Sequence, residues 1–142
     1  MDKKYTTKSF QDTQKLGQDF AQEVLDLQKK SGAIVLCLEG NLGGGKTTFL
    51  QGFAKGLGIK EKILSPTFVI MKKFGNFYHF DCYRINKPEE ILELGWKEII
   101  SDPQNIVAIE WPEKIKKYLP KNTIKADFKF INEETREIEF KT

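Results

Sequence analysis

The feature that most constrains this chain is an apolar run that leads directly into a glycine-rich loop. The run spans residues 34–38, and after Glu39 the sequence reads Gly40-Asn41-Leu42-Gly43-Gly44-Gly45-Lys46-Thr47-Thr48. A short continuous apolar run is typical of a strand buried on both faces. The spacing of Gly40 from Gly45, Lys46 and Thr47 is that of a Walker A loop. The stretch therefore predicts a strand, a phosphate-binding loop and a helix in succession.

Each residue type in this loop suits the binding of a polyphosphate. Backbone N–H groups must approach the phosphates closely, and the consecutive glycines that end at Gly45 lack a Cβ and accept positive φ. The following helix adds its dipole, and Lys46 reaches the β- and γ-phosphates. The motif places the Thr47 hydroxyl on Mg²⁺ and Thr48 near the α-phosphate. The alternative is a glycine-rich turn without a ligand, but the strand before it and the amphipathic helix after it favour the phosphate site.

Length and composition indicate one domain, residues 1–142, that does not enter a membrane. A chain of 142 residues can bury a single core without disulfides or metals. Its apolar runs are far shorter than the about 20 residues of a membrane span, and the N-terminus lacks the apolar segment of a signal peptide. We therefore expect a cytoplasmic location. The net charge of +3 permits an acidic partner such as RNA without indicating one.

The rest of the chain predicts alternating helices and strands. Ser9, followed by Asp12, is a capping-type start for a helix over residues 10–29. Spacings near three and four predict that this helix packs inward through Phe10, Leu16, Phe20, Val24 and Leu27. The turn residues at 75–76 predict an antiparallel hairpin between the segments that flank them, the second of which runs from Phe77 to Arg84. Further strands are expected at residues 5–8, 105–110, 123–131 and 137–140, and further helices at 49–57, 88–94, 96–100 and 113–118.

The order of these elements predicts the fold class. The strand, loop and helix at the Walker motif and the later buried strand at residues 106–109 require a parallel core covered by helices. The hairpins near Phe77 and at the C-terminus add antiparallel strands. We therefore expect an α/β, P-loop NTPase-like three-layer fold with a mixed, mainly parallel central sheet and antiparallel hairpin additions. Cys37 and Cys82 fall in expected strands without metal-ligand spacing, and we interpret them as buried thiols.

Two acidic residues are candidates for the metal-dependent chemistry that such a loop supports. Glu110 ends an apolar strand, as Walker B acids do, and would lie at the sheet edge where open α/β folds bind ligands. Asp81 lies between aromatic residues in a half-buried strand, which is unfavourable for a carboxylate unless it is paired or near a metal. For Glu110 the alternative is a solvated strand end. For Asp81 it is an ion pair with Arg84 or a contact with His79, which shares a strand face with Asp81 and Tyr83.

Two further residues carry weaker signals. Thr67 lies in a Ser-Pro-Thr turn and is a candidate γ-phosphate sensor, like the switch threonine of GTPases. A turn of this kind is not diagnostic by itself. His79 alone is more often a structural histidine than a catalyst.

In combination these motifs resemble one family, the bacterial ATPase of the tRNA threonylcarbamoyladenosine pathway, called TsaE or YjeE. The Walker A loop alone would indicate a superfamily, whereas four motifs at family-like intervals are specific. Gly44 stands where the family usually has alanine and Cys82 where it usually has an aliphatic residue, and neither change affects the expected binding. The resemblance covers nearly the whole chain and rests on Leu38 to Thr48, Ser65-Pro66-Thr67-Phe68, His79-Phe80-Asp81-Cys82-Tyr83-Arg84 and Ile109-Glu110-Trp111-Pro112-Glu113.

The resemblance implies a small P-loop ATPase that uses ATP and Mg²⁺. It implies that the chain acts with the TsaB and TsaD proteins in placing threonylcarbamoyl on an adenosine of the tRNA anticodon loop, without performing the transfer itself. Contact with tRNA is expected to be indirect or weak. The lack of an Asn-Lys-x-Asp guanine motif agrees with ATP, and the lack of an obvious arginine finger predicts slow hydrolysis by the chain alone.

The resemblance also implies roles for individual residues. Catalytic roles fall on Lys46, Thr67, Asp81 and Glu110, and the metal ligands are Thr47 and Glu110. Nucleotide contacts are implied for Ser9, Gly40, Asn41, Leu42, Gly43, Gly44, Gly45, Lys46, Thr47, Thr48 and Arg136. Two other functions stay open: a small-molecule kinase, although no arginine-bearing lid insertion is visible, and a non-catalytic nucleotide-gated adaptor.

Overall fold

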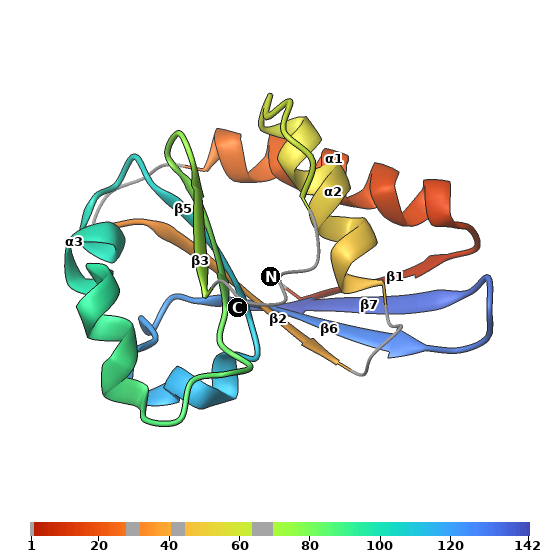
Figure 1. The fold of residues 1–142 in the computed structure, drawn as a ribbon. Helices are drawn as coiled ribbons and strands as arrows, with labels where there is room; N and C mark the ends of the chain where they lie inside the picture. The colour runs from red at the N-terminus through yellow and green to blue at the C-terminus, as the bar shows by residue number, and fades with distance from the viewer. Residues whose placement is uncertain (1, 28–31, 41–44, 64–69) are drawn as a thin grey trace. The chain divides into compact units, whose positions relative to one another are not determined.

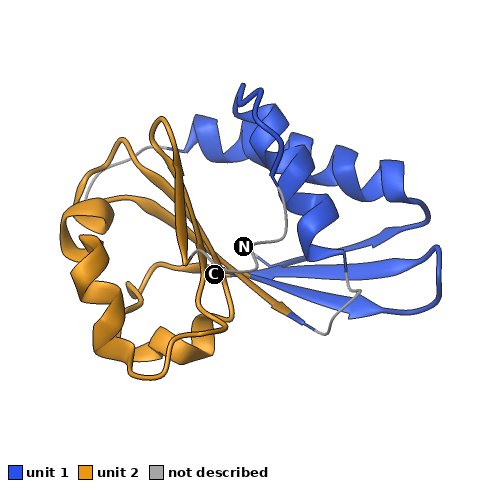
Figure 2. Cartoon of the chain, in the orientation of Figure 1, with its two compact units in different colours: residues 1–28, 40–65, 126–141 blue, residues 29–39, 66–125, 142 orange. Residues whose placement is uncertain are grey.

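The computed structural model describes residues 2–27, 32–40, 45–63 and 70–142 of the chain (Figure 1). The chain forms two compact units, which Figure 2 shows in different colours. Unit 1 contains residues 1–28, 40–65 and 126–141, and unit 2 contains residues 29–39, 66–125 and 142. Five residues predicted to bind nucleotide or sense phosphate lie outside the described residues, namely Asn41, Leu42, Gly43, Gly44 and Thr67.

Unit 1 joins two helical segments to antiparallel strands. Its elements are β1 (Lys3–Thr7), α1 (Phe10–Asp26), α2 (Lys46–Gly56), β7 (Arg136–Lys141) and the part of β6 (Ile124–Phe130) that follows residue 125. The strand order is β1-β7-β6. β1 runs antiparallel to β7, with Tyr5 opposite Ile138. Residues 131–135 join β6 to β7, a connection too short for a parallel crossover.

Aromatic contacts hold the helices of unit 1 on its strands. Phe20 of α1 stacks on Phe140 of β7, with ring centroids 4.4 Å apart. Phe49 of α2 meets Phe128 of β6 edge-on at 5.4 Å. Stacked and edge-on pairs of this kind stabilise the fold by about 1 kcal/mol beyond the contribution of the surface area that they bury. Phe20 therefore faces inward from α1, as predicted.

The predicted start of α1 is confirmed, whereas its predicted length and inward face are partly wrong. Ser9 caps the helix, because its Oγ accepts a hydrogen bond of 3.0 Å from the backbone N–H of Asp12. The helix ends at Asp26, since Leu27 has an extended backbone. Phe10 and Leu27 are 57% and 49% exposed, because they lie at the two ends of the helix, beyond the reach of the core. Its fully buried positions are Thr13, Gly17, Ala21 and Val24.

Glycines let α1 and α2 approach each other closely. A Cβ on Gly17 would lie 2.2 Å from the carbonyl oxygen of Phe49. A Cβ on Gly52 would lie 1.9 Å from the carbonyl oxygen of Gln14. Both distances are far inside van der Waals contact, so backbone meets backbone at these positions and a larger residue would separate the helices.

Unit 2 is built around parallel strands with helical segments packed against them. The strands are β2 (Ile34–Gly40, up to Glu39), β3 (Met71–Phe74), β4 (Phe77–Asp81) and β5 (Ile106–Glu110), in the order β2-β5-β4-β3. β5 is parallel to both of its neighbours, and β3 is antiparallel to β4. The helical segments are η1 (Pro88–Leu94), α3 (Trp96–Ser101) and η2 (Pro112–Tyr118).

Trp96 connects the sheet of unit 2 with its helical layer. Its ring lies edge-on to Phe80 of β4, with centroids 5.3 Å apart. Its indole N–H donates a hydrogen bond of 3.1 Å to the backbone carbonyl of Tyr118, at the end of η2. One buried side chain therefore fixes α3 against both β4 and η2, and it satisfies its own polar group in doing so.

The hairpin predicted at residues 75–76 is confirmed in the part that the structure describes. Met71 pairs with Phe80 and Phe74 with Phe77, and Gly75 has φ of 62° in the turn. The second strand ends at Asp81, which corrects the prediction that it continues to Arg84. The strand ends there because the Asp81 carboxylate accepts a hydrogen bond from the backbone N–H of Tyr83, which starts a turn.

The mixed α/β class predicted from the sequence is confirmed. Parallel pairing joins β2, β5 and β4, and antiparallel pairing adds β3 in unit 2 and forms β1-β7-β6 in unit 1. The apolar strand predicted at residues 105–110 corresponds to β5, which is buried at every position. No helix in the described ranges has the length and apolar character needed to cross a membrane.

The cysteines are buried thiols in unit 2, as predicted. Cys37 and Cys82 are both free and have no exposed surface. Burial raises the pKa of each thiol from 9.0 to about 12. The negative charges of Glu39 near Cys37 and of Asp81 near Cys82 act in the same direction. Both groups are therefore chemically inert in the folded protein.

We predict that neither thiol reacts with an aromatic disulfide reagent at pH 8 until the protein unfolds. Each folded pKa lies above its unfolded value, so the associated stability is fully present below pH 9.0 and is lost as the pH rises toward about 12. Labelling in a urea series and unfolding at several pH values test this, with the Cys37→Ala/Cys82→Ala variant as the control for other titrating groups. Rapid labelling of the native protein would contradict the burial.

We predict that Gly52→Ala destabilises the protein by about 2 kcal/mol, because the added methyl group forces α1 away from α2. Helix propensity alone would give the opposite sign, a gain of about 1 kcal/mol. Urea unfolding measures the difference. Lys55→Ala, at an exposed position of the same helix, serves as the control and should stay within about 0.5 kcal/mol of wild type. A more stable Gly52→Ala protein would show that the helices are not in close contact.

Candidate functional site

The described ends of the Walker A loop have backbone conformations that favour glycine. Gly40 has φ of 132°, and a Cβ there would lie 2.2 Å from the carbonyl oxygen of Phe128. Gly45 has φ of 98° and ψ of 10° and occupies the N-cap position of α2. A Cβ on Gly45 would meet its neighbours at ordinary distances of 3.5 Å, so at this position the backbone angle is the reason for glycine.

Lys46, the first residue of α2, reaches back across the loop. Its ammonium group donates a hydrogen bond of 2.9 Å to the carbonyl oxygen of Gly40, and the residue is only 9% exposed. The two ends of the loop are therefore held together by a buried cation. A phosphate bound by the loop would meet this cation, which suits the role predicted for Lys46.

Thr47 and Thr48 lie in the first turn of α2 and are half-buried. Gly45 has no side chain with which to cap the helix, so the N–H groups of the first turn need another acceptor. The helix dipole favours a negative charge at this end. A phosphate group meets both requirements, which is the usual reason that phosphates bind at helix N-termini.

Arg136, predicted from the terminal hairpin, lies beside the N-terminus of α2. Its Cγ is 3.5 Å from the position that a Cβ on Gly45 would occupy. Its Nη1 donates to the carbonyl oxygens of turn residues 132, 133 and 135, and its guanidinium lies 4.6 Å from the ring centre of Phe130. In the described part of the chain, Nε of Arg136 is buried without a hydrogen-bond partner. A buried N–H group left in this way costs about 1–3 kcal/mol, so the arrangement suits a ligand that accepts a hydrogen bond.

Thr13 is a residue of this region that the sequence analysis missed. Its Cγ2 lies 3.5 Å from the same position beside Gly45, and its hydroxyl is 2.7 Å from that of Thr7. It also donates to the carbonyl oxygen of Ser9. Ser9, predicted to contact nucleotide, is thus the cap of α1, one turn before Thr13. A threonine on the otherwise apolar inward face of this helix was the signal available in the sequence.

Asp81 and Glu110 end neighbouring strands of unit 2 at the same level. Asp81 of β4 is the register partner of Glu110 of β5, and Leu38 of β2 is the register partner of Glu110 on the other side. Paired residues of adjacent strands point to the same face of a sheet. The two acids therefore share a face and a strand edge, whereas the sequence predicted a place at this edge for Glu110 alone.

Glu110 is buried, which excludes the alternative of a solvated strand end. The residue is 6% exposed. Its Oε2 lies 2.8 Å from Nε2 of His79, and the two side chains are 7% and 3% exposed. Because a carboxylate accepts, Nε2 of His79 carries the proton of this hydrogen bond. His79 therefore pairs with Glu110, whereas the sequence analysis had considered a contact with Asp81.

Asp81 organises the turn that follows β4. Its Oδ1 accepts a hydrogen bond of 3.0 Å from the backbone N–H of Tyr83. The ring of Tyr83, 58% exposed, lies 5.0 Å from the ring of Trp111, the residue after Glu110. Trp111 has φ of 58° and ψ of 51°, a left-handed conformation that costs an ordinary residue about 1–2 kcal/mol. The segments after both acids are thus in contact through two aromatic rings.

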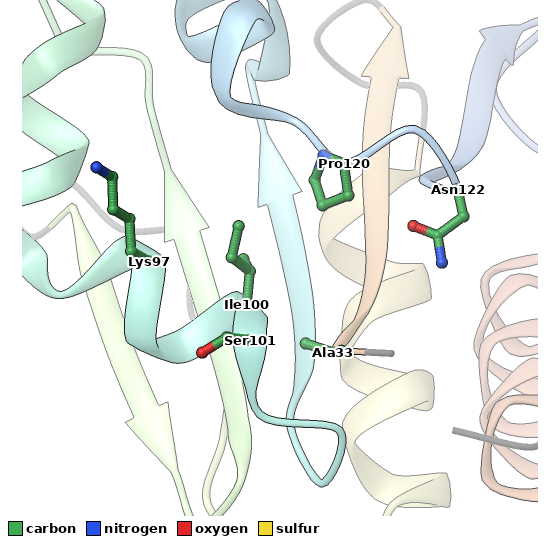
Figure 3. A pocket seen from close by; sticks show the side chains of 7 residues that line it. Ala33, Lys97, Ile100, Ser101, Pro120 and Asn122 are labelled. Atoms are coloured by element: carbon green, nitrogen blue, oxygen red, sulfur yellow. The ribbon is translucent and has the colours of Figure 1, made fainter. Parts of the chain in front are cut away.

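A cavity of unit 2 lies away from these acids (Figure 3). Its volume is about 330 Å³. Among the described residues that line it, Lys97 is the one ionisable side chain, so these residues offer no pair of groups for acid–base chemistry. None of the predicted site residues lines it. Figure 3 shows Ala33, at the amino end of β2, opposite Pro120 and Ile100.

Comparison with known proteins identifies one family. The family model of the threonylcarbamoyl adenosine biosynthesis protein TsaE matches residues 7–138. The tRNA threonylcarbamoyladenosine biosynthesis protein TsaE of Bacillus subtilis is 41% identical over 110 residues, which cover 75% of this chain and 68% of that protein. The protein of the same name from Treponema pallidum is 33% identical over 135 residues, covering 93% and 95%. The crystal structure of YdiB from Bacillus subtilis matches with a TM-score of 0.74 and 31% identity, covering 99% of this chain and 84% of that one.

We predict that Asp81→Ala lowers the free energy of unfolding by about 1 kcal/mol, because the N–H of Tyr83 loses its acceptor. Asp81→Asn keeps an oxygen at this position and should unfold within about 0.5 kcal/mol of wild type. Urea unfolding of the two variants provides the comparison. Equal losses in both variants would argue that the charge of Asp81, rather than its hydrogen bond, holds the turn.

Proposed function

Because the chain belongs to the TsaE family of threonylcarbamoyl adenosine biosynthesis proteins, we propose that it is a Mg²⁺-dependent ATPase that supports threonylcarbamoylation of tRNA. The proposal rests mainly on the Walker A sequence and on the hydrogen bond that Lys46 donates to the carbonyl oxygen of Gly40. Such a loop binds nucleoside triphosphates through backbone N–H groups and the lysine. The ATPase is an accessory protein and not the threonylcarbamoyl transferase.

The residues of unit 1 fit a bound ATP molecule. The first turn of α2 offers N–H groups without a side-chain cap, and Lys46 supplies a buried positive charge for the β- and γ-phosphates. The buried Nε of Arg136 needs an acceptor that the described residues do not provide. We assign Arg136, with Ser9 and Thr13, to the surroundings of the nucleotide beyond its phosphates.

The residues proposed as metal ligands are of the types that magnesium sites of P-loop proteins use. Mg²⁺ in such sites takes one or two protein oxygens, phosphate oxygens and several waters. In the described ranges, His, Cys, Asp and Glu form no group of three or more that could hold a metal by itself. Thr47 would supply a hydroxyl and Glu110 a carboxylate. When bound, the ion would neutralise the charge that develops on the phosphates.

The other proposed site residues bind the terminal phosphates, orient the attacking water or position the Glu110 carboxylate. Lys46 binds the terminal phosphates and offsets their negative charge. We propose that Asp81, the register partner of Glu110, orients a water or responds to the nucleotide. Glu110 has a carboxylate already held by His79, so little reorganisation is needed when it binds a metal. We propose Thr67 as the γ-phosphate sensor because of its position in the Ser-Pro-Thr sequence.

The proposed partners are the TsaB and TsaD proteins, with tRNA contacted indirectly or weakly. The relatives carry names of tRNA threonylcarbamoyladenosine biosynthesis, a reaction that requires more than an ATPase. Hydrolysis by the chain alone should be slow, since its motifs include no obvious arginine finger. A cytoplasmic location is part of the proposal, and the free, buried cysteines agree with a reducing compartment.

We predict that Lys46→Ala and Glu110→Gln fail at different steps. Lys46→Ala should weaken ATP binding, because the phosphates lose a buried cation. Glu110→Gln should still bind nucleotide in the absence of metal, but its Mg²⁺-dependent rate of ATP hydrolysis should fall by about 10-fold or more. Nucleotide titration and steady-state ATPase assays, with and without the TsaB and TsaD pair, measure these effects. Lys55→Ala is the control in the same helix.

Two results would overturn parts of the proposal. Normal turnover in Glu110→Gln would remove this residue from the metal site. Fast hydrolysis by the isolated chain, unaffected by the partner pair, would remove the coupling to partners. A non-hydrolysable ATP analogue that sustains repeated tRNA modification would favour the nucleotide-gated adaptor, and phosphorylation of a small acceptor would favour the kinase.

A further inference from the structure

We propose that His79 is a positioning residue for the metal-binding carboxylate of Glu110. The inference rests on the proposed metal role of Glu110 and adds a residue to which the motifs assign no function. By donating a hydrogen bond to Oε2, His79 fixes the rotation of the carboxylate. The other oxygen, Oε1, is then the one presented to magnesium.

Strand register brings these two side chains together. His79 of β4 pairs with Ala108 of β5, so it lies on the same sheet face as Glu110, two residues further along β5. The Nε2–Oε2 distance is 2.8 Å, and both side chains are more than nine-tenths buried. A buried carboxylate needs hydrogen bonds, and a bond to a charged acceptor is about twice as strong as a neutral one. The contact is therefore a well-defined feature of the folded chain.

The pattern of hydrogen bonds on Glu110 points to positioning rather than to stability alone. Within the described residues, His79 donates the hydrogen bond that Oε2 accepts, and Oε1 is not among the buried atoms that lack a partner, so solvent reaches it. An oxygen that solvent reaches is also open to a metal ion, whereas Oε2 is held by the imidazole. One oxygen held by a neighbour and one left for the ion is the arrangement that groups around a metal ligand usually produce.

The role does not depend on the charge of the imidazole. Nε2–H donates in the neutral tautomer that carries its proton on Nε2, and it donates equally in the imidazolium form. The role requires an N–H group at the distance from the backbone at which His79 carries Nε2. Glutamine can supply one at a similar distance along its side chain, whereas leucine has none and asparagine is shorter by one methylene. These three substitutions therefore separate the donor from the volume of the side chain.

The experiment is a double-mutant cycle read out by metal affinity. Wild type, Glu110→Gln, His79→Leu and the double variant are each loaded with ADP, and Mn²⁺ binding is titrated by electron paramagnetic resonance. Metal-free ADP affinity is measured separately by calorimetry. We expect His79→Leu to weaken Mn²⁺ binding by about 10–100-fold and to leave metal-free ADP affinity unchanged. In the Glu110→Gln background, His79→Leu should cause no further loss, because the histidine acts through Glu110.

Conservative variants and a neighbouring residue complete the test. His79→Gln should recover most of the Mn²⁺ affinity, and His79→Asn should not. If His79→Leu fails to fold, the Gln and Asn variants alone decide the question, and equal affinities in the two would overturn the proposal. Tyr78→Phe, the adjacent residue on the opposite face of β4, should bind Mn²⁺ like wild type.

The outcomes separate this inference from the function on which it rests. Unchanged Mn²⁺ affinity in Glu110→Gln would show that Glu110 is not a metal ligand, and both proposals about this residue would fail. Weak Mn²⁺ binding in Glu110→Gln together with normal binding in His79→Leu would overturn the positioning role alone. An equal effect of His79→Leu in the presence and absence of the Glu110 carboxylate would also overturn it.

Discussion

The register of three parallel strands is the constraint on which the chemistry of unit 2 depends. Leu38, Glu110 and Asp81 are partners across β2, β5 and β4, so β5 and β4 end at the same level and β2 continues to Gly40. A slip of one residue in β5 would turn Glu110 to the other face of the sheet and separate it from His79. The apolar side chains of β5, buried at every position, make such a slip unfavourable. Core packing thus fixes the placement of the acids.

A different interaction sets the geometry of unit 1. The close contact of α1 with α2, through Gly17 and Gly52, places the N-terminus of α1 beside that of α2. Thr13 and Arg136 then lie around Gly45, and the buried ammonium of Lys46 reaches the carbonyl of Gly40. The described ends of the glycine-rich loop, Gly40 and Gly45, are therefore adjacent to closely packed helix backbone and to polar side chains. Both are consistent with a preorganised anion site.

Local sequence signals predicted much of this structure. The glycine-rich loop, the Ser9 cap and the strand that ends at Glu110 were visible because each follows from a short pattern with a direct physical cause. The class of fold followed from the order of such patterns. The exposure of Phe10 and Leu27 was not predictable in the same way, because periodicity defines the face of a helix but not where the core ends.

The contacts that give the site its geometry could not be read from local patterns. His79 and Glu110 are 31 residues apart, and their hydrogen bond exists only in one register of β4 against β5. Gly17 and Thr13 were missed because a small or polar residue on an inward helix face resembles a break in the hydrophobic pattern. In both cases the decisive information is the partner element, which no single segment contains.

The metal role proposed for Glu110 can be tested most directly at His79, whose side chain is hydrogen-bonded to its carboxylate. His79 is the single histidine of the chain, so its imidazole nitrogens give isolated signals in a histidine-labelled nitrogen-15 NMR spectrum. We predict that Mn²⁺–ADP broadens these signals strongly, because Nε2 is hydrogen-bonded to the carboxylate that we propose as a metal ligand, whereas Mg²⁺–ADP shifts them without broadening. Sharp histidine signals in a protein saturated with Mn²⁺–ADP would contradict it.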